Sequence, residues 1–312
     1  MKNLVKLVGI IVMVAVIALA GCESKEQKTE KARIAAEQKA EAERIEAEQK
    51  AREDLTAAFA DLDESAIAEY TKTLAPDLIV AVLKDADPKA VTLVLNNASP
   101  ALVTTLVQAM PTPVSDFSYG QTADRKGVVI TGYTGRGGAI LIPPTIEDLP
   151  VLEIGKDAFR GRVNNNWQRA SYITSIVIPN SVKIIRQDAF YYAANITSLV
   201  IPDSVETIEE GDFGTFGNMS NLTRVTLPDG LKVIPSYAFP SCAKLTAINL
   251  PASLESIGQS AFISCSALTD LVIPDSLTSI RFTRGGSAFL RCGKLPIRTR
   301  QRLQELGYRD EF

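Results

Sequence analysis

The sequence that decides the fold is Leu268-Thr269-Asp270-Leu271-Val272-Ile273-Pro274-Asp275-Ser276-Leu277, a phrase that recurs along the second half of the chain. Earlier copies begin at Leu245 and at Ile196, and regular copies are 23 residues apart. An isoleucine and a phenylalanine follow, as in Ile257 and Phe262, the phenylalanine usually after an alanine. Self-similarity at a period of roughly 20–50 residues indicates a stacked array of similar units. The sequence therefore predicts a solenoid.

Two residue types mark the register of the array. The prolines of the phrase are Pro143, Pro179, Pro202, Pro228, Pro251 and Pro274. The corresponding phenylalanines are Phe159, Phe190, Phe213, Phe239, Phe262 and Phe289. Against a regular spacing of 11 residues from proline to phenylalanine and 12 onward, four insertions appear: before Phe159, between Phe159 and Pro179, between Phe213 and Pro228, and before Phe289. Insertions in a solenoid map to loops.

Each phrase carries a strand pattern. Apolar residues occupy the first, fourth and sixth positions, and the last two alternate with one other residue, which is strand periodicity. A single repeat cannot bury such a face, but stacked neighbours bury it as a continuous core. Proline then ends the strand, and the Ala-Phe half returns along the other side with phenylalanine in the interior. We expect a parallel-β leucine-rich-repeat solenoid.

These repeats resemble the BspA-like, or treponemal-type, leucine-rich repeat family. The segments 127–133 and 142–151 also resemble the first coil of that family. The resemblance covers about residues 118–295, and six copies agree in register. It implies a curved parallel-β solenoid on a bacterial surface, where such proteins usually serve adhesion or protein binding.

The composition excludes several function classes. The chain has 312 residues, which allows roughly two or three domains. Its formal net charge of −3 argues against general nucleic-acid binding. It contains no histidine, so Ser-His and Cys-His nucleophiles and histidine-containing zinc sites are excluded. We therefore expect no enzyme, no cofactor and no metal site.

The first residues read as a bacterial lipoprotein leader. Lys2 and Lys6 precede a short apolar run, which Leu19-Ala20-Gly21-Cys22 closes with small residues. A run this short is typical of a cleaved secretory leader rather than a membrane span. The resemblance to a lipoprotein box implies that residues 1–21 are removed and that Cys22 is acylated. The alternatives are an ordinary signal peptide and an uncleaved anchor.

Residues 22–55 follow as a charged helical stalk. Glu, Lys, Gln, Arg and Ala dominate this segment, and all are strong helix formers. An 11-residue echo, visible at Ile34 and Ile45, favours a straight or slightly right-handed coil. The stalk is a spacer above the membrane, either as a coiled coil or as a solvated single helix.

Residues 56–113 hold a second repeat of about 12 residues, marked by Pro76, Pro88 and Pro100. Asp87 and Ser99 precede two of these prolines, so a capping residue is followed by proline in the first helical position. The capping chemistry predicts short helices, with strands as the alternative because of the β-branched content. We interpret this part as a small α-helical domain that joins the stalk to the solenoid.

Residues 114–312 form the solenoid with its C-terminal cap. The insertion 160–172 carries the only tryptophan, Trp167, together with three arginines. Tryptophan and arginine are residue types that dominate protein interfaces, so Trp167 is a candidate contact; the alternative is a ring folded over the solenoid edge. After Pro296, the polar segment 299–306 predicts a short helix that shields the last coil.

Three cysteines recur three residues after the repeat phenylalanine: Cys242, Cys265 and Cys292. Ala193 fills the same position in an earlier coil, so the position is small and buried, where cysteine acts as a small apolar residue. The 23-residue spacing between Cys242 and Cys265 is not a zinc spacing. We predict free, buried thiols; a disulfide between two of them is the alternative.

The candidate ligand-binding residues flank the second apolar position of each strand and are expected to point outward. Stacking in register turns them into two ladders: Ser175, Ser198, Arg224, Ala247 and Asp270, and Val177, Val200, Thr226, Asn249 and Val272. Such extended faces bind partners in solenoid proteins. The hypothesis is a lipid-anchored envelope protein, at the outer membrane or cell surface, that binds host, matrix or envelope proteins. The alternative is a structural envelope component without a host ligand.

Overall fold

A computed structural model of the chain describes residues 25–61, 63–83, 110–163, 166–167, 169–280 and 287–309, with residues 86, 91, 94–95, 98–99, 102 and 105–106 between them. The chain divides into two compact units, residues 1–55 and residues 56–312. The leader and Cys22 lie outside the described residues.

Helix α2 (Lys25–Asp61) contains the predicted stalk and continues beyond it. Its 37 residues correspond to a length of about 55 Å. Most of its side chains between residues 32 and 54 are exposed, and ion pairs one turn apart, such as Arg33 with Glu37 at 2.8 Å, line its surface. Intrinsic propensity and such local pairs therefore maintain the exposed part. Within the described residues, no helix is both long enough and apolar enough to span a bilayer.

Two further helices follow, α3 (Glu64–Thr73) and α4 (Pro76–Leu83). The Asp63 carboxylate accepts hydrogen bonds from the backbone N–H groups of Ser65 and Ala66, both at 3.0 Å, which caps the start of α3. Pro76 occupies the first position of α4, as the repeat predicts. The described segments 64–73 and 76–83 are therefore helical, as the capping residues predict, and single described residues farther along, including Val94 and Leu106, also have helical backbone.

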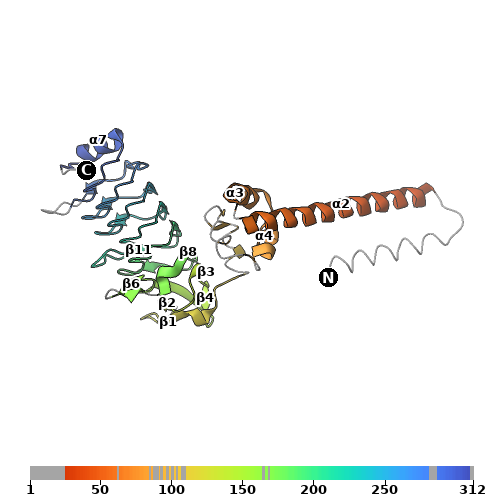
Figure 1. Cartoon of the computed structure of the whole chain (residues 1–312), viewed down its shortest axis with the longest axis horizontal. Helices are drawn as coiled ribbons and strands as arrows, with labels where there is room; N and C mark the ends of the chain where they lie inside the picture. Colours follow the sequence, from red (N-terminus) through yellow and green to blue (C-terminus); the bar gives the residue numbers. More distant parts are fainter. Residues whose placement is uncertain are drawn as a thin grey trace. The chain divides into compact units, whose positions relative to one another are not determined.

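The solenoid consists of two rows of short parallel strands (Figure 1). The first row contains β3 (Gly138–Leu141), β8 (Ile173–Val177), β10 (Ser198–Val200), β12 (Arg224–Thr226) and β14 (Ala247–Asn249). The second row contains β5 (Leu149–Ile154), β9 (Ile184–Ile185), β11 (Thr207–Ile208), β13 (Val233–Ile234), β15 (Ser256–Ile257) and β16 (Ser279–Ile280). Pairs such as Leu199 with Val225 and Val225 with Ile248 keep equivalent residues in register. The predicted parallel-β solenoid is confirmed.

Different devices close the two ends of the solenoid. At the start, η1 (Val114–Asp116) leads into β1 (Phe117–Gln121), which pairs antiparallel with β2 (Val128–Tyr133), and β4 (Thr145–Ile146) pairs antiparallel with β5. The Thr112 N–H donates to the Leu141 carbonyl at 3.0 Å, and the Leu141 N–H donates to Thr112 Oγ1 at 2.9 Å, so the entry segment covers the edge of β3.

At the other end, the predicted helix after Pro296 is present as α7 (Ile297–Glu305) (Figure 1). Leu303 is buried, and the Thr299 hydroxyl donates to the carbonyl of Leu271 in the preceding coil at 2.8 Å. Gly307, with φ +91°, ends the helix in the left-handed conformation that favours glycine. The chain then turns Tyr308 into the core.

A column of stacked aromatic rings fills the interior. The rings of Phe159, Phe190, Phe216, Phe239, Phe262 and Phe289 are fully buried. Neighbouring centroids lie between 4.9 and 5.6 Å apart, and the planes differ by no more than 16°. Tyr133 and Tyr308 contact the two ends of the column at 6.3 and 6.0 Å with tilted rings. One phenylalanine per coil therefore joins all the coils into a single core.

The assignment of Phe213 to this column is wrong. Phe213 is 51% exposed, and Phe216 takes its place between Phe190 and Phe239. The three-residue insertion therefore precedes the phenylalanine of this coil instead of following it. Thr215 replaces the usual alanine, and its carbonyl accepts the N–H of Phe190 at 2.9 Å, as the alanine carbonyls do in the other coils.

Backbone conformation identifies the same register. The residue two places before each of the other central phenylalanines has a positive φ: Asp157, Asp188, Tyr237 and Ser260. In the irregular coil this position is Gly214, with φ +100°. A Cβ atom there would lie 2.4 Å from the Tyr237 carbonyl oxygen, so only glycine fits. The glycine marks the turn that restores the repeat after the insertion.

The three described cysteines are free and completely buried, as predicted. Each thiol donates a hydrogen bond to the carbonyl of a phenylalanine in an earlier coil: Cys242 to Phe216, Cys265 to Phe239 and Cys292 to Phe262, all at 3.1 Å. Burial raises the pKa of Cys265 and brings the pKa of Cys292 to about 12. Cys265 and Cys292 therefore stay protonated, and all three cysteines pack as small core side chains.

Substituting the two phenylalanines of the irregular coil separates their roles. We expect Phe216→Ala to lower the free energy of unfolding by about 3–5 kcal/mol, because it leaves a cavity in the column. Phe213→Ala removes an exposed ring and should cost within ~1 kcal/mol. Urea unfolding of both variants is the measurement. Equal losses, or a larger loss for Phe213→Ala, would contradict the assigned register.

Thiol titration of protein carrying Cys22→Ser should find no reactive cysteine in the native state and three after denaturation. Only the thiolate reacts, and an unfolded cysteine has a pKa of about 8.5. Raising the pH from about 8 to about 10 should therefore ionise the thiols of unfolded protein, while native Cys292, with a pKa near 12, stays unreactive. A blocked pair in denatured, unreduced protein would show a disulfide instead.

Candidate interaction surface

The strands of the first row place the predicted outward residues side by side. Ser198 pairs with Arg224 and Arg224 with Ala247, and an isolated bridge continues the row to Asp270. The second ladder pairs Val200 with Thr226 and Thr226 with Asn249. The intervening Leu199, Val225 and Ile248 are buried. From β10 onward, the alternation between core and solvent follows the pattern expected from the sequence.

Exposure along these ladders is substantial. Val200 is 60% exposed and Val272 is 76% exposed, although both are apolar. Arg224, Thr226, Asn249 and Asp270 are also exposed, whereas Ser198 and Ala247 are half-buried. Four coils of small and apolar side chains, with one cation and one anion, thus form a continuous, nearly neutral surface.

The first rung of each ladder departs from the prediction. Ser175 is 5% exposed and Val177 is 7% exposed, so the expectation that they face solvent is wrong. Both lie in β8, next to the edge where Thr112 is hydrogen-bonded to β3. In β8, residues on both faces of the strand are buried, so the expected alternation between core and solvent is lost. Strands covered on both faces behave in this way. The open surface therefore begins at Ser198.

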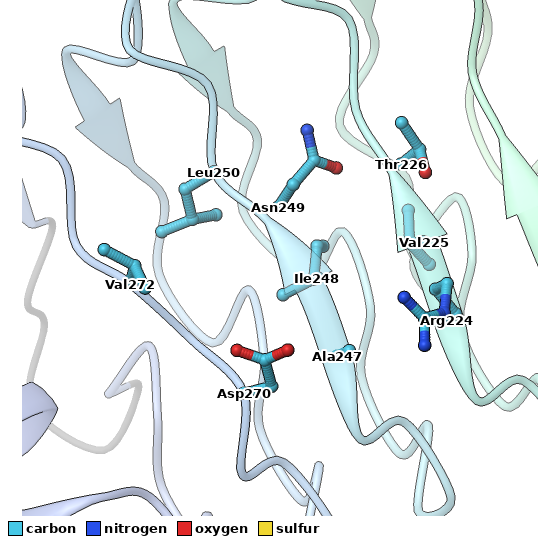
Figure 2. Close-up of a pocket in the computed structure, with 9 residues that line it drawn as sticks. All are labelled: Arg224, Val225, Thr226, Ala247, Ile248, Asn249, Leu250, Asp270 and Val272. Atoms are coloured by element: carbon cyan, nitrogen blue, oxygen red, sulfur yellow. The ribbon is translucent and has the colours of Figure 1, made fainter.

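A shallow pocket of about 270 Å³ lies on this surface (Figure 2). It is lined by Arg224, Val225, Thr226, Ala247, Ile248, Asn249, Leu250, Asp270 and Val272. Arg224 and Asp270 stand on either side of Ala247, two strand spacings or roughly 10 Å apart along the backbone. Among the described residues neither side chain has an ion-pair partner. The pocket therefore presents separated opposite charges over an apolar floor.

Asn249 has a structural role besides its place in the ladder. Its Oδ1 accepts the Leu227 N–H at 2.8 Å, and its Nδ2 donates to the Leu227 carbonyl at 3.4 Å. In the preceding coil the equivalent N–H, that of Ile201, bonds to the backbone carbonyl of Thr226. The Asn249 amide thus replaces a backbone partner where the strands separate beside the pocket.

The insertion that carries Trp167 forms a small hairpin. β6 (Arg162–Val163) pairs antiparallel with β7 (Asn166–Trp167), and η2 (Arg169–Tyr172) leads into β8. The Gly161 N–H donates to the Tyr191 carbonyl at 2.8 Å, which ties the start of the hairpin to the next coil. A Cβ atom on Gly161 would lie 1.9 Å from the Tyr192 carbonyl oxygen, so the close approach requires glycine.

Beside this hairpin lies an aromatic cluster that sequence reasoning missed. The rings of Tyr191 and Phe213 stack at 5.3 Å, and the Arg160 guanidinium lies 5.0 and 4.9 Å from their centroids. Asp157 holds Arg160 with an ion pair of 2.8 Å. Asp188 Oδ1 accepts the Phe213 N–H at 3.1 Å. The only clue in the sequence is that Phe213 lies in the insertion of its coil. Assigning Phe213 to the core column hid this clue.

The described residues contain no group of three side chains suited to hold a metal ion. The ladders and the aromatic cluster offer apolar packing, ring stacking and a few separated charges.

The repeat region is similar to known leucine-rich repeat proteins. Residues 153–296 match the model of the BspA type leucine-rich repeat region in six copies. A crystallised leucine-rich repeat protein of T. pallidum is 29% identical over 65% of this chain and 98% of its own, with a TM-score of 0.53. A leucine-rich cell surface protein of Faecalibacterium prausnitzii is 26% identical over 60% of this chain and 53% of its own, with a TM-score of 0.43. No curated protein matches the sequence.

Proposed function

Residues 153–296 belong to the BspA-type leucine-rich repeat family, and from this premise we propose that the chain is a lipid-anchored bacterial envelope protein whose solenoid binds other proteins. Leucine-rich repeat domains generally mediate protein–protein interaction. The partner is a host, matrix or envelope protein, and the binding serves adhesion.

One observation carries this proposal: an open sheet surface on which the exposed residues vary while the buried ones do not. Ser198, Arg224, Ala247 and Asp270 share a position but differ in size and charge, whereas the neighbouring inward positions are all Leu, Ile or Val. The core fixes only the inward residues, so the outward ones are free to fit a partner. Low net charge favours a partner recognised by shape, with Arg224 and Asp270 orienting it.

The N-terminal part supports the envelope location. Leu19-Ala20-Gly21-Cys22 resembles a lipoprotein box, and α2 begins only three residues after Cys22. We propose that acylated Cys22 holds the chain to the membrane and that α2, about 55 Å long, acts as a spacer. We further propose display at the outer membrane or cell surface, which suits a binding surface held away from the membrane by a spacer. The proposed role is binding without catalysis, which fits a chain that contains no histidine.

A second candidate function is a scaffold inside the envelope with no host ligand. The cluster of Arg160, Tyr191 and Phe213 favours it, because tyrosine and arginine are interface residue types and these residues lie outside the first-row strands that carry the ladders. The hairpin of Trp167 adjoins it. A protein of the same envelope could hold the solenoid there.

Site-specific photo-crosslinking tests where the partner binds. A crosslinking residue at Val200, on the open surface, should form an adduct with a protein on intact cells or matrix. The matched control is Val233, a valine that is 49% exposed in the other row of strands. The double variant Ser198→Glu with Ala247→Arg should remove the Val200 adduct and leave stability within about 0.5 kcal/mol. Adducts at Val233 alone would contradict this surface.

The same experiment distinguishes the rival site. If the adduct survives Ser198→Glu with Ala247→Arg but is lost with Trp167→Ala, the insertion binds the partner and the ladders do not. Digestion of the protein by protease added to intact cells indicates surface display; protection until lysis favours the scaffold.

The anchor has its own test. Cys22→Ala should leave an unprocessed precursor, because acylation of this cysteine precedes cleavage in a lipoprotein. Metabolic labelling with a clickable fatty acid and the migration of the protein on a gel are the measurements. A Cys22→Ala protein that is cleaved and remains on the membrane like the wild type would refute acylation at this residue.

A further inference from the structure

Charge is strongly segregated along the chain. The last 32 residues contain 8 basic and 3 acidic side chains, whereas the preceding 280 contain 25 basic and 33 acidic ones. The C-terminal end of the solenoid is therefore positive and the rest of the chain negative. Folding of the repeats does not require this charge asymmetry, because their core is apolar.

Two of the basic side chains of the cap stabilise it internally. Arg300 donates to the carbonyls of Leu295 and Gly293, at the end of the last coil. Arg302 pairs with Glu305 at 3.1 Å and lies 3.9 Å from Asp275. These two arginines hold α7 against the solenoid.

The other cations of the cap have no such role. Arg291, Lys294, Arg298 and Arg309 are exposed, and none makes an ion pair or a side-chain hydrogen bond among the residues from 287 to 309 or with the rest of the described chain. In that same segment Glu305 is the one acidic residue, and Arg302 already neutralises it. Among the described residues of this end of the solenoid, four positive charges thus have no acidic partner.

An exposed apolar side chain lies among them. Ile297, the first residue of α7, is 75% exposed and directly precedes Arg298. The inward side of the helix is occupied, since Thr299 and Leu303 are buried against the last coil. Burying the core does not require Ile297. An exposed isoleucine next to Arg298, in a segment with three further exposed cations, is a combination that an anionic membrane interface accommodates.

We propose that the C-terminal cap is a docking surface for a membrane containing anionic phospholipid. Arg291, Lys294, Arg298 and Arg309 attract the headgroups, and Ile297 enters the boundary between headgroups and acyl chains. The acidic remainder of the solenoid is repelled by the same surface, so the molecule approaches it with the cap first. This docking goes beyond protein binding by the ladders and depends on neither that function nor the acylation of Cys22.

Vesicle sedimentation tests the proposal. The chain from residue 22 onward, with Cys22→Ser so that it carries no lipid, retains all described residues. It should sediment with vesicles of equal parts phosphatidylcholine and phosphatidylglycerol and stay in solution with phosphatidylcholine alone. Raising the salt from about 50 to about 500 mM should weaken binding strongly, because a membrane's surface charge acts only within a Debye length.

Variants locate the surface. Changing the four cations Arg291, Lys294, Arg298 and Arg309 to Gln should lower the partition coefficient about a hundredfold or more. The matched control changes four exposed cations near the other end of the solenoid to Gln: Arg125, Lys126, Arg136 and Lys156. It loses the same charge and should keep vesicle binding. Ile297→Ser should weaken binding several-fold at unchanged salt dependence.

Three results would overturn the proposal: no sedimentation with anionic vesicles, equal loss in the two quadruple variants, or binding to soluble polyglutamate but not to vesicles. The last would identify the cap as a site for acidic protein. Circular dichroism and thermal unfolding of each variant confirm that a loss of binding is not a loss of fold.

Discussion

The separation between neighbouring coils is the constraint on which the whole solenoid depends. Parallel strands lie about 4.8 Å apart, and the aromatic rings of the core stack at 4.9 to 5.6 Å. Both distances are set by the separation between one coil and the next. Each coil must therefore place its phenylalanine at the equivalent position above the phenylalanine of the coil before it. The left-handed residue two places before five of the rings, the small residue beside each ring and the buried thiols follow from this requirement. Extra residues are tolerated only where they leave the ring position unchanged.

This constraint explains what the sequence could predict. The 23-residue period, the strand phrase, the buried cysteines and the terminal helix all follow from patterns that repeat or that end a repeat. Phe213 was misplaced because it stands at the regular distance from Pro202, while Phe216 has threonine instead of alanine before it. Gly214 marks the true register, because it has the positive φ of the residue two places before the buried phenylalanine. That φ value is visible in the structure and not in the sequence.

The candidate surfaces were less predictable, for a physical reason. Periodicity tells which side chains leave the core but not what covers them afterward. Ser175 and Val177 obey the pattern and are nevertheless buried, beside an entry segment that no repeat encodes. The ring contact between Tyr191 and Phe213 joins a coil to an insertion, and the Arg160 contact spans a second coil. Contacts of this kind depend on three-dimensional position, which spacing alone does not supply.

The sealed ends of the solenoid have an evolutionary consequence. Tyr133 and the antiparallel β1–β2 pair close one end of the aromatic column, and Tyr308 with α7 closes the other. Both ends of the core are thus covered by elements outside the repeat, and each interior coil contacts only its two neighbours. Gene duplication could therefore insert or delete a 23-residue unit in the middle without disturbing either closure. The open surface can lengthen or shorten in steps of one coil while both ends of the solenoid stay closed.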